Sequence, residues 1–143
     1  MEHTYFYKTL SWKANGTYYD ETEKKYPLYG EVSIIHDHIQ WTLTGFLEVQ
    51  YDTPVRFTNN YDIYSTRLEN TLLWESYNPA LGTLKGTFEI VGSSIISSYR
   101  SHDGKYSGTE TLVQINSKEY YNAGVSFCDG VKMSSWTARL ETE

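Results

Sequence analysis

Apolar and polar residues alternate along most of the chain in runs of the length of a β-strand. Such runs recur about every 10–12 residues, a spacing typical of a sandwich or a barrel of short strands. No long stripe of apolar residues at helical spacing interrupts them, so we expect no helix longer than a single turn. The predicted strands cover residues 3–10, 14–20, 29–36, 39–50, 54–64, 70–77, 83–91, 94–102, 105–115, 118–128 and 131–141.

Three short turns between these runs determine the expected pairing of the strands. They are centred on Asp37-His38, Asp103-Gly104 and Asp129-Gly130. Asp-Gly is typical of a two-residue hairpin loop of type I′, in which both residues have a positive φ. Because the loop fixes the register, it also determines which side chains share a face of the sheet.

The number and spacing of the runs predict a closed sheet. A chain of 143 residues is long enough for one domain with a sizeable core. Consecutive antiparallel strands need their edges hidden, and closure into a barrel achieves this most simply. We therefore expect an all-β fold, a lipocalin-like, single antiparallel up-and-down β-barrel of about 8–10 strands over residues 1–143. A flattened sandwich of two sheets is the alternative.

The first hairpin is predicted to have one apolar and one polar face. With a two-residue loop, Ile34 lies opposite Trp41, and Val32 lies opposite Leu43. The reverse face carries serine, threonine and glutamate, as a half-buried hairpin requires. His36 lies on the apolar side at the end of the hairpin, so we expect it near a rim of the barrel.

The second hairpin is predicted to place an acidic residue on the inner face. Tyr99 lies opposite Gly108, and an aromatic side chain over a cross-strand glycine closes a bare patch of sheet. Ser97 lies opposite Glu110 on the same face, which also carries Leu112. Glu110 is thus the most unexpected polar residue inside the predicted barrel.

The third hairpin has one face that is richer in apolar side chains, and we expect this face to be the inner one. It carries Phe127, Val125, Ala123, Tyr121, Trp136, Ala138 and Leu140. The other face pairs Tyr120 with Arg139, so this register points the arginine outward. A single β-bulge would exchange the two faces.

The composition narrows the range of partners and compartments. Lys and Arg number 12 and Asp and Glu 18, a formal net charge of −6. No basic patch is evident, so we expect neither nucleic acid nor a membrane surface as a partner. The first residues lack the apolar stretch of a secretory signal, and no segment is long enough to span a bilayer as a helix. The single Cys128 cannot form an internal disulfide, so we expect a cytoplasmic protein.

The sequence contains no motif that predicts a metal or a cofactor. His36-Asp37-His38 would place two imidazoles on one face of a strand, but a hairpin loop points them apart. The glycine patterns of nucleotide-binding folds and the nucleophile motifs of common hydrolases are absent. Cys128 has no base beside it. We therefore expect no metal and no cofactor.

Aromatic residues and Glu110 are the candidates for function. Aromatic residues make up 16% of the chain, with 14 tyrosines. They either cover the sheet or line a ligand cavity. A carboxylate on an inner face costs free energy unless it is paired or protonated, so the pKa of Glu110 is expected to rise. Such a group can act as a general acid or base, or bind the polar end of a ligand. The alternative is structural, with Ser97 and a tyrosine hydroxyl as its hydrogen-bond partners.

The succession of strands and the last third of the chain, at residues 86–90, 106–110 and 132–136, resemble calycin-type barrels. These are the lipocalins, the fatty-acid-binding proteins and the lipocalin-like phycobiliprotein lyases. The resemblance implies an internal cavity for an apolar small molecule and no reaction. Arg139 in the final strand is similar to the carboxylate-binding arginine of fatty-acid-binding proteins, so this likeness gives it a place in the site.

These observations favour a binding protein for a small, largely apolar or aromatic ligand. The expected ligand-binding residues are Ile34, Trp41, Leu43, Tyr99, Tyr106 and Leu112, with Glu110, His36 and Arg139 as polar contacts. A barrel enzyme is one alternative, a decarboxylase, cyclase or isomerase of an aromatic or lipid-like acid that uses Glu110, Tyr99 and Tyr106. A homodimeric interaction module without a ligand is the other.

Overall fold

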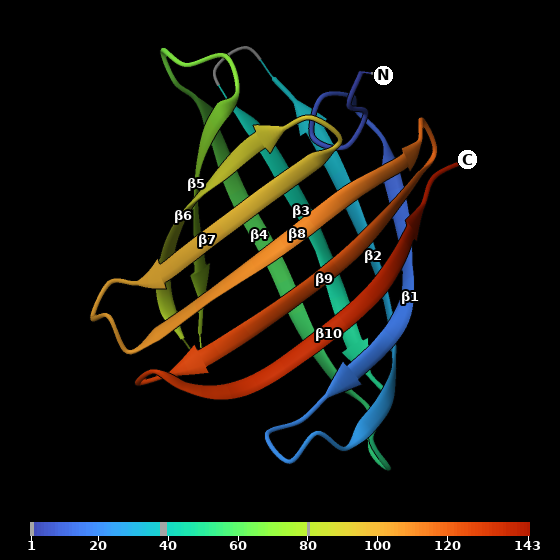
Figure 1. The fold of residues 1–143 in the computed structure, drawn as a ribbon, viewed down its shortest axis with the longest axis vertical. Coiled ribbons are helices and arrows are strands. Elements are labelled where there is room, and N and C mark those ends of the chain that lie inside the picture. The colour runs from blue at the N-terminus through green and yellow to red at the C-terminus, as the bar shows by residue number, and fades with distance from the viewer. Residues whose placement is uncertain (1, 38–39, 80) are drawn as a thin grey trace.

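The protein folds into a closed barrel of antiparallel strands (Figure 1). The computed structural model describes residues 2–37, 40–79 and 81–143, and these form ten strands and no helix. The strands are β1 (Ser11–Tyr19), β2 (Lys25–His36), β3 (Trp41–Val49), β4 (Val55–Ser65), β5 (Thr71–Asn78), β6 (Gly82–Val91), β7 (Ser94–Ser101), β8 (Tyr106–Asn116), β9 (Glu119–Cys128) and β10 (Val131–Glu141). Each strand pairs with the next along the chain, and β1 pairs with β10 to close the ring. The predicted all-β, up-and-down barrel is confirmed.

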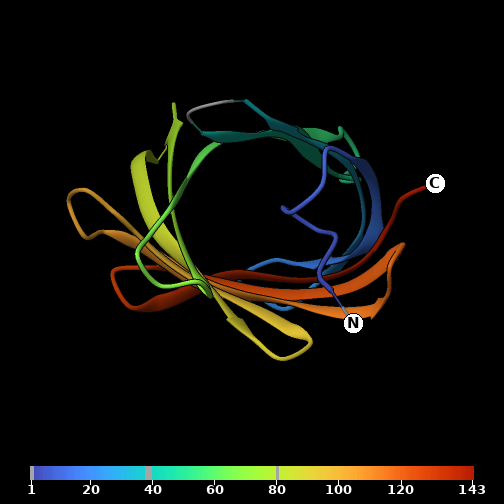
Figure 2. The same ribbon diagram turned by 90° about the horizontal axis from the view of Figure 1, so that it is seen from above.

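The first predicted strand, residues 3–10, is wrong. Residues Thr4–Tyr7 form a turn, closed by a hydrogen bond of 3.2 Å from the Lys8 amide to the Thr4 carbonyl. This turn, which we call the N-terminal plug, lies inside the ring at the upper end of the barrel, where β1 begins (Figure 2). Because β1 already pairs with both neighbours, no sheet edge is left for this segment, and its aromatic side chains are buried inside the barrel instead.

The N-terminal plug packs into the aromatic core of the upper end. Phe6 is 1% exposed, and its ring lies 4.2 Å from that of Phe88. Tyr5 contacts Trp12 and Tyr120, with ring centroids 5.3 and 5.6 Å apart. The Tyr120 hydroxyl accepts hydrogen bonds from the amides of the plug. The upper end is therefore filled with side chains.

The second predicted register is confirmed, and the other two are offset. Tyr99 pairs with Gly108, and Ser97 with Glu110, as expected. The first hairpin is two residues longer, so that Ile34 pairs with Leu43, which leaves the faces unchanged because side chains alternate with a period of two.

The third hairpin begins as predicted but is interrupted by a bulge. Asp129 and Gly130 have φ values of 51° and 80°, as a type I′ turn requires. A β-bulge between Lys132 and Ser134 then shifts the register by one residue. The inner face of β9 therefore carries Tyr120, Asn122, Gly124 and Ser126, and not Tyr121, Ala123, Val125 and Phe127, as the uninterrupted register predicts.

Small residues line much of the interior. Six strand glycines pair with inward-facing residues and lie on the inner face: Gly16, Gly30, Gly45, Gly86, Gly108 and Gly124. Side chains can just fill a barrel of about eight strands. In a ring of ten strands, glycine at these positions keeps the inner wall free of side chains there.

Candidate functional site

At the lower end of the barrel, where β1 ends, Tyr18, Tyr26 and Tyr51 pack against the core, but other inward-facing apolar side chains stay exposed. By register, Val55 and Phe57 of β4 face inward opposite Val49 and Leu47. Val55 nevertheless remains 41% exposed and Phe57 42% exposed, and Leu47 is half-buried. Apolar side chains on the inner face are thus open to solvent at this end.

The sheet is also least complete at the lower end. The ladder between β4 and β5 runs from Tyr61 paired with Ser76 to Ser65 paired with Leu72. In the described part of the chain, the first six residues of β4 therefore pair with β3 alone. The seam between β4 and β5 is therefore partial at this end, next to the exposed Phe57.

Glu110 lies on the inner face in the middle of β8, between Ser97 of β7 and Gly124 of β9. The side chains of Asn122 and Trp136 lie beside it and lower its pKa. The Trp136 indole N–H also lies 3.0 Å from the Asn122 Oδ1 and donates to it. Burial raises the pKa of Glu110, and these two side chains only partly oppose that effect. Although Glu110 is deep in the barrel, it remains half-buried, so it borders interior space.

Aromatic rings form the wall around Glu110. Tyr61 and Trp74 stack with centroids 4.4 Å apart and planes at 6°, and the Tyr99 ring lies 5.9 Å from Trp74. The Trp74 indole N–H donates to the Ser97 hydroxyl at 3.2 Å. We call Tyr61, Trp74, Tyr99, Glu110, Asn122 and Trp136 the lumen cluster.

Three rings of the lumen cluster lie against glycines of neighbouring strands. A Cβ added at Gly86 would lie 2.6 Å from the Trp74 Cε2, and one at Gly124 would lie 2.6 Å from the Trp136 Cε2. A Cβ at Gly108 would collide with the Tyr99 ring. The glycines therefore let these rings lie along the wall, which keeps them out of the centre of the lumen.

The tyrosines near Glu110 are held in their neutral form. Burial raises the pKa of Tyr99 to about 12, with a further contribution from the charge of Glu110. The same two causes, burial first, raise the pKa of Tyr61 and of Tyr5. At neutral pH these hydroxyls are hydrogen-bond donors and not bases.

Among the described residues, no Lys or Arg side chain is buried beside Glu110. All twelve Lys and Arg residues lie within the described residues, and all are exposed. Arg139 lies on the outer face of β10 and forms an ion pair with Glu119 of β9. The carboxylate-binding arginine that the resemblance implies is therefore not inside the barrel, because the alternation of β10 points Trp136 and Ala138 inward and Arg139 outward.

The other residues expected in the site lie in different parts of the barrel. Ile34, Leu43 and Leu112 face inward but are at most 4% exposed, so they belong to the packed core. His36 stacks on Trp41 at 4.2 Å at the upper rim, and its Nε2 lies 2.6 Å from the Phe6 carbonyl.

Tyr106 is separated from Glu110. It begins β8, and the ammonium group of Lys105 lies 5.4 Å from its ring centroid. Of the two tyrosines expected beside Glu110, Tyr99 is close enough for the carboxyl charge to raise its pKa.

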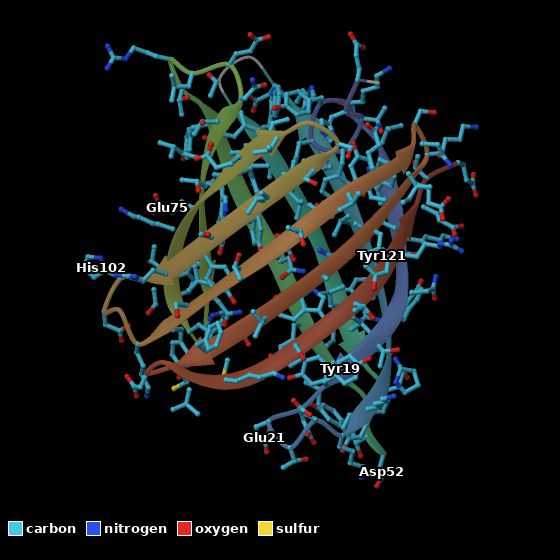
Figure 3. All side chains as sticks on the ribbon, in the orientation of Figure 1. Tyr19, Glu21, Asp52, Glu75, His102 and Tyr121 are labelled. Atoms are coloured by element: carbon cyan, nitrogen blue, oxygen red, sulfur yellow. The ribbon has the colours of Figure 1, made fainter. Side chains whose placement is uncertain are left out.

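The sequence analysis missed Tyr61, Asn122 and the N-terminal plug. The bulge in β10 hides Asn122, since the uninterrupted register points it outward. Tyr121, which that register points inward, is 48% exposed on the outer face (Figure 3). Tyr61 lies in a predicted strand, but no Asp-Gly turn fixed the pairing of that strand.

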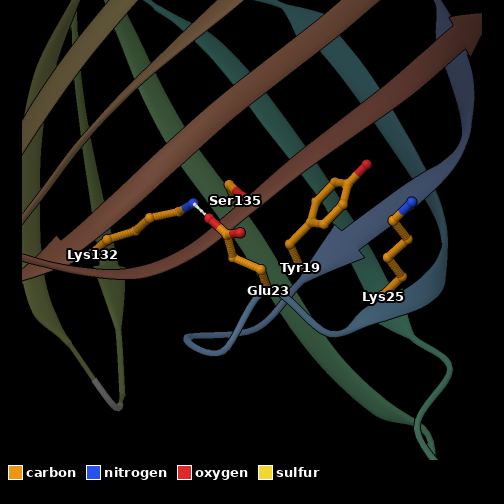
Figure 4. A pocket seen from close by; sticks show the side chains of 5 residues that line it. All are labelled: Tyr19, Glu23, Lys25, Lys132 and Ser135. Carbon is orange, nitrogen blue, oxygen red and sulfur yellow. Dashed lines mark hydrogen bonds and ion pairs between the residues drawn. The ribbon is translucent and has the colours of Figure 1, made fainter.

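A hollow of about 280 Å³ lies on the outside, between the β1–β2 turn and the start of β10 (Figure 4). It is lined by Tyr19, Glu23, Lys25, Lys132 and Ser135. The Lys132 ammonium pairs with the Glu23 carboxylate at 3.1 Å, and both side chains are well exposed. Exposed ion pairs of this kind are screened by water and contribute little to the stability of the fold.

Among the described residues, no group of three or more His, Cys, Asp and Glu side chains is arranged to hold a metal ion. His38 of the His36-Asp37-His38 motif lies outside the described residues. Within residues 2–37, 40–79 and 81–143, no helix is long and apolar enough to cross a membrane.

Comparisons of the chain with protein-family models, with curated proteins and with solved structures give no match. The interpretation of the site therefore depends on its geometry.

Proposed function

We propose that the protein binds a small, largely apolar or aromatic molecule inside the barrel, at the lumen cluster. The observation that carries the proposal is the position of Glu110, a polar group on an inner wall of aromatic rings and glycines. Binding sites for small molecules are usually apolar concavities with a few polar groups that orient the ligand. The lumen cluster has this composition.

The direction of entry follows from the two ends of the barrel. The N-terminal plug fills the upper end, with Phe6 1% exposed. The lower end has exposed inward side chains at Val55 and Phe57 and an incomplete seam between β4 and β5. A ligand enters from the lower end and stops beneath the plug.

A titration with N-phenyl-1-naphthylamine, an apolar dye that fluoresces when it leaves water, tests the proposal. We expect one dye molecule per protein. Leu47→Trp, which enlarges a half-buried inner residue at the lower end, should weaken binding at least tenfold. The matched control is Leu73→Trp on the outer face of β5, where Leu73 is 46% exposed. The absence of dye binding, or an equal loss in both variants, would contradict binding inside the barrel.

A further inference from the structure

We infer that the ligand carries a basic nitrogen, which forms an ion pair with Glu110 while its aromatic part contacts the rings of the lumen cluster. This inference rests on the proposed function and names the chemical class of the ligand. It excludes the fatty-acid type of ligand that an inward arginine would bind.

Among the described residues, Glu110 has no Lys or Arg partner for its charge. Asn122 and Trp136 favour the charged form of the carboxyl and lower its pKa, against the effect of burial. All Lys and Arg side chains are exposed, and Arg139 is engaged with Glu119 outside the barrel. A buried carboxylate without a cation is costly, and a ligand that brings the cation removes that cost.

The aromatic wall near Glu110 also favours a cationic ligand. The faces of aromatic rings carry partial negative charge and attract cations, with tryptophan the strongest of them. The Trp74 ring lies 4.4 Å from the Tyr61 ring and 5.9 Å from the Tyr99 ring, and the Trp136 indole donates a hydrogen bond to Asn122. A carboxyl group with aromatic rings around it suits an ammonium or amidinium group attached to an aromatic ring.

Binding requires at most one proton transfer, from Glu110 to the ligand. If Glu110 is protonated in the free protein, its proton passes to the neutral base of the ligand. If Glu110 is ionised, the ligand binds already protonated. Both routes give the same ion pair, with no covalent bond formed or broken.

The test compares three probes with one ring system: 2-naphthylmethylamine, 2-naphthylmethanol and 2-naphthoic acid. Their affinities for the full chain are measured by calorimetry at pH 7. The amine should bind at least tenfold more tightly than the alcohol, and the acid should bind most weakly. Glu110→Gln should reduce the preference for the amine over the alcohol to less than threefold. Glu75→Gln, at an exposed carboxylate on the outer face of β5 (Figure 3), should leave it unchanged.

The outcomes separate the two proposals. Equal binding of all three probes, tightest binding of the acid, or a preference for the amine that survives in Glu110→Gln would overturn the inference and leave the proposed function standing. If no probe binds, the proposed function fails and the inference fails with it. If Glu110→Gln does not fold, the order of the three affinities in the wild-type protein still decides.

Discussion

Gly124→Ala is a sharp test of the arrangement in which a tryptophan lies flat on the barrel wall. The added Cβ would lie 2.6 Å from the Trp136 Cε2, closer than van der Waals contact allows, so the ring must move. It can move only into the lumen, and it then loses its 3.0 Å hydrogen bond to the Asn122 Oδ1. Overpacking costs about 1–3 kcal/mol. A buried donor left without its partner adds about 1–3 kcal/mol.

We therefore expect Gly124→Ala to lower the free energy of unfolding by about 2–6 kcal/mol. Urea denaturation measures this change, and the tryptophan emission of the folded variant should shift as Trp136 leaves the wall. The control is Gly92→Ala, where nothing lies within 4 Å of the added Cβ and the φ of 58° alone is costly. It should lose about 1–2 kcal/mol without a change in emission. Wild-type stability and wild-type emission in Gly124→Ala would refute the reasoning.

Three further predictions follow from the same structure. Burial raises the pKa of Glu110 in the folded protein, so wild-type stability should fall as pH rises from below the ordinary value of 4.5 through the raised pKa. Glu110→Gln removes this dependence, so the free energy of unfolding of the variant relative to wild type should rise with pH, by about 1.4 kcal/mol for each unit of pKa shift. Urea denaturation between pH 4 and pH 8 measures this difference. A difference that falls with pH would contradict the burial of Glu110. Phe6→Ala should lower the free energy of unfolding by about 3–5 kcal/mol, measured by thermal or urea unfolding, because Phe6 is 1% exposed. The control Leu68→Ala, at a residue that is 68% exposed, should lower it by less than about 0.5 kcal/mol. Similar losses in both variants would show that the N-terminal plug is not packed inside the barrel. Arg139→Ala should lower the free energy of unfolding by less than about 1 kcal/mol and leave the affinity for 2-naphthylmethylamine unchanged, because the ion pair of Arg139 lies on the outer face. A loss of that affinity in calorimetry would place the arginine in the site.

Alternation and turn chemistry predicted the barrel because both are local properties of the sequence. Asp103-Gly104 gave the correct register for β7 and β8, and with it the inward position of Glu110 beside Ser97. The hydrophobic pattern alone placed ten of the eleven runs in strands. These parts needed no knowledge of contacts between distant residues.

The features that the sequence did not predict depend on contacts between distant residues. The bulge between Lys132 and Ser134 cannot be recognised from the alternation of apolar and polar residues in β10. It shifts the pairing with β9 by one residue and so places Asn122 on the inner face. The run of aromatic residues at 3–10 is as suitable for a strand as its neighbours. It is excluded from the sheet because β1 and β10 pair with each other, more than a hundred residues apart in sequence.

The most direct test of ligand binding inside the barrel is an NMR experiment on the protein with bound 2-naphthylmethylamine. Nuclear Overhauser effects report which protons lie within a few ångströms of the probe. We predict contacts from the naphthyl protons to the half-buried rings of Tyr99 and Trp136, which line the lumen. Contacts only to outer-face residues such as Tyr121 would contradict the account.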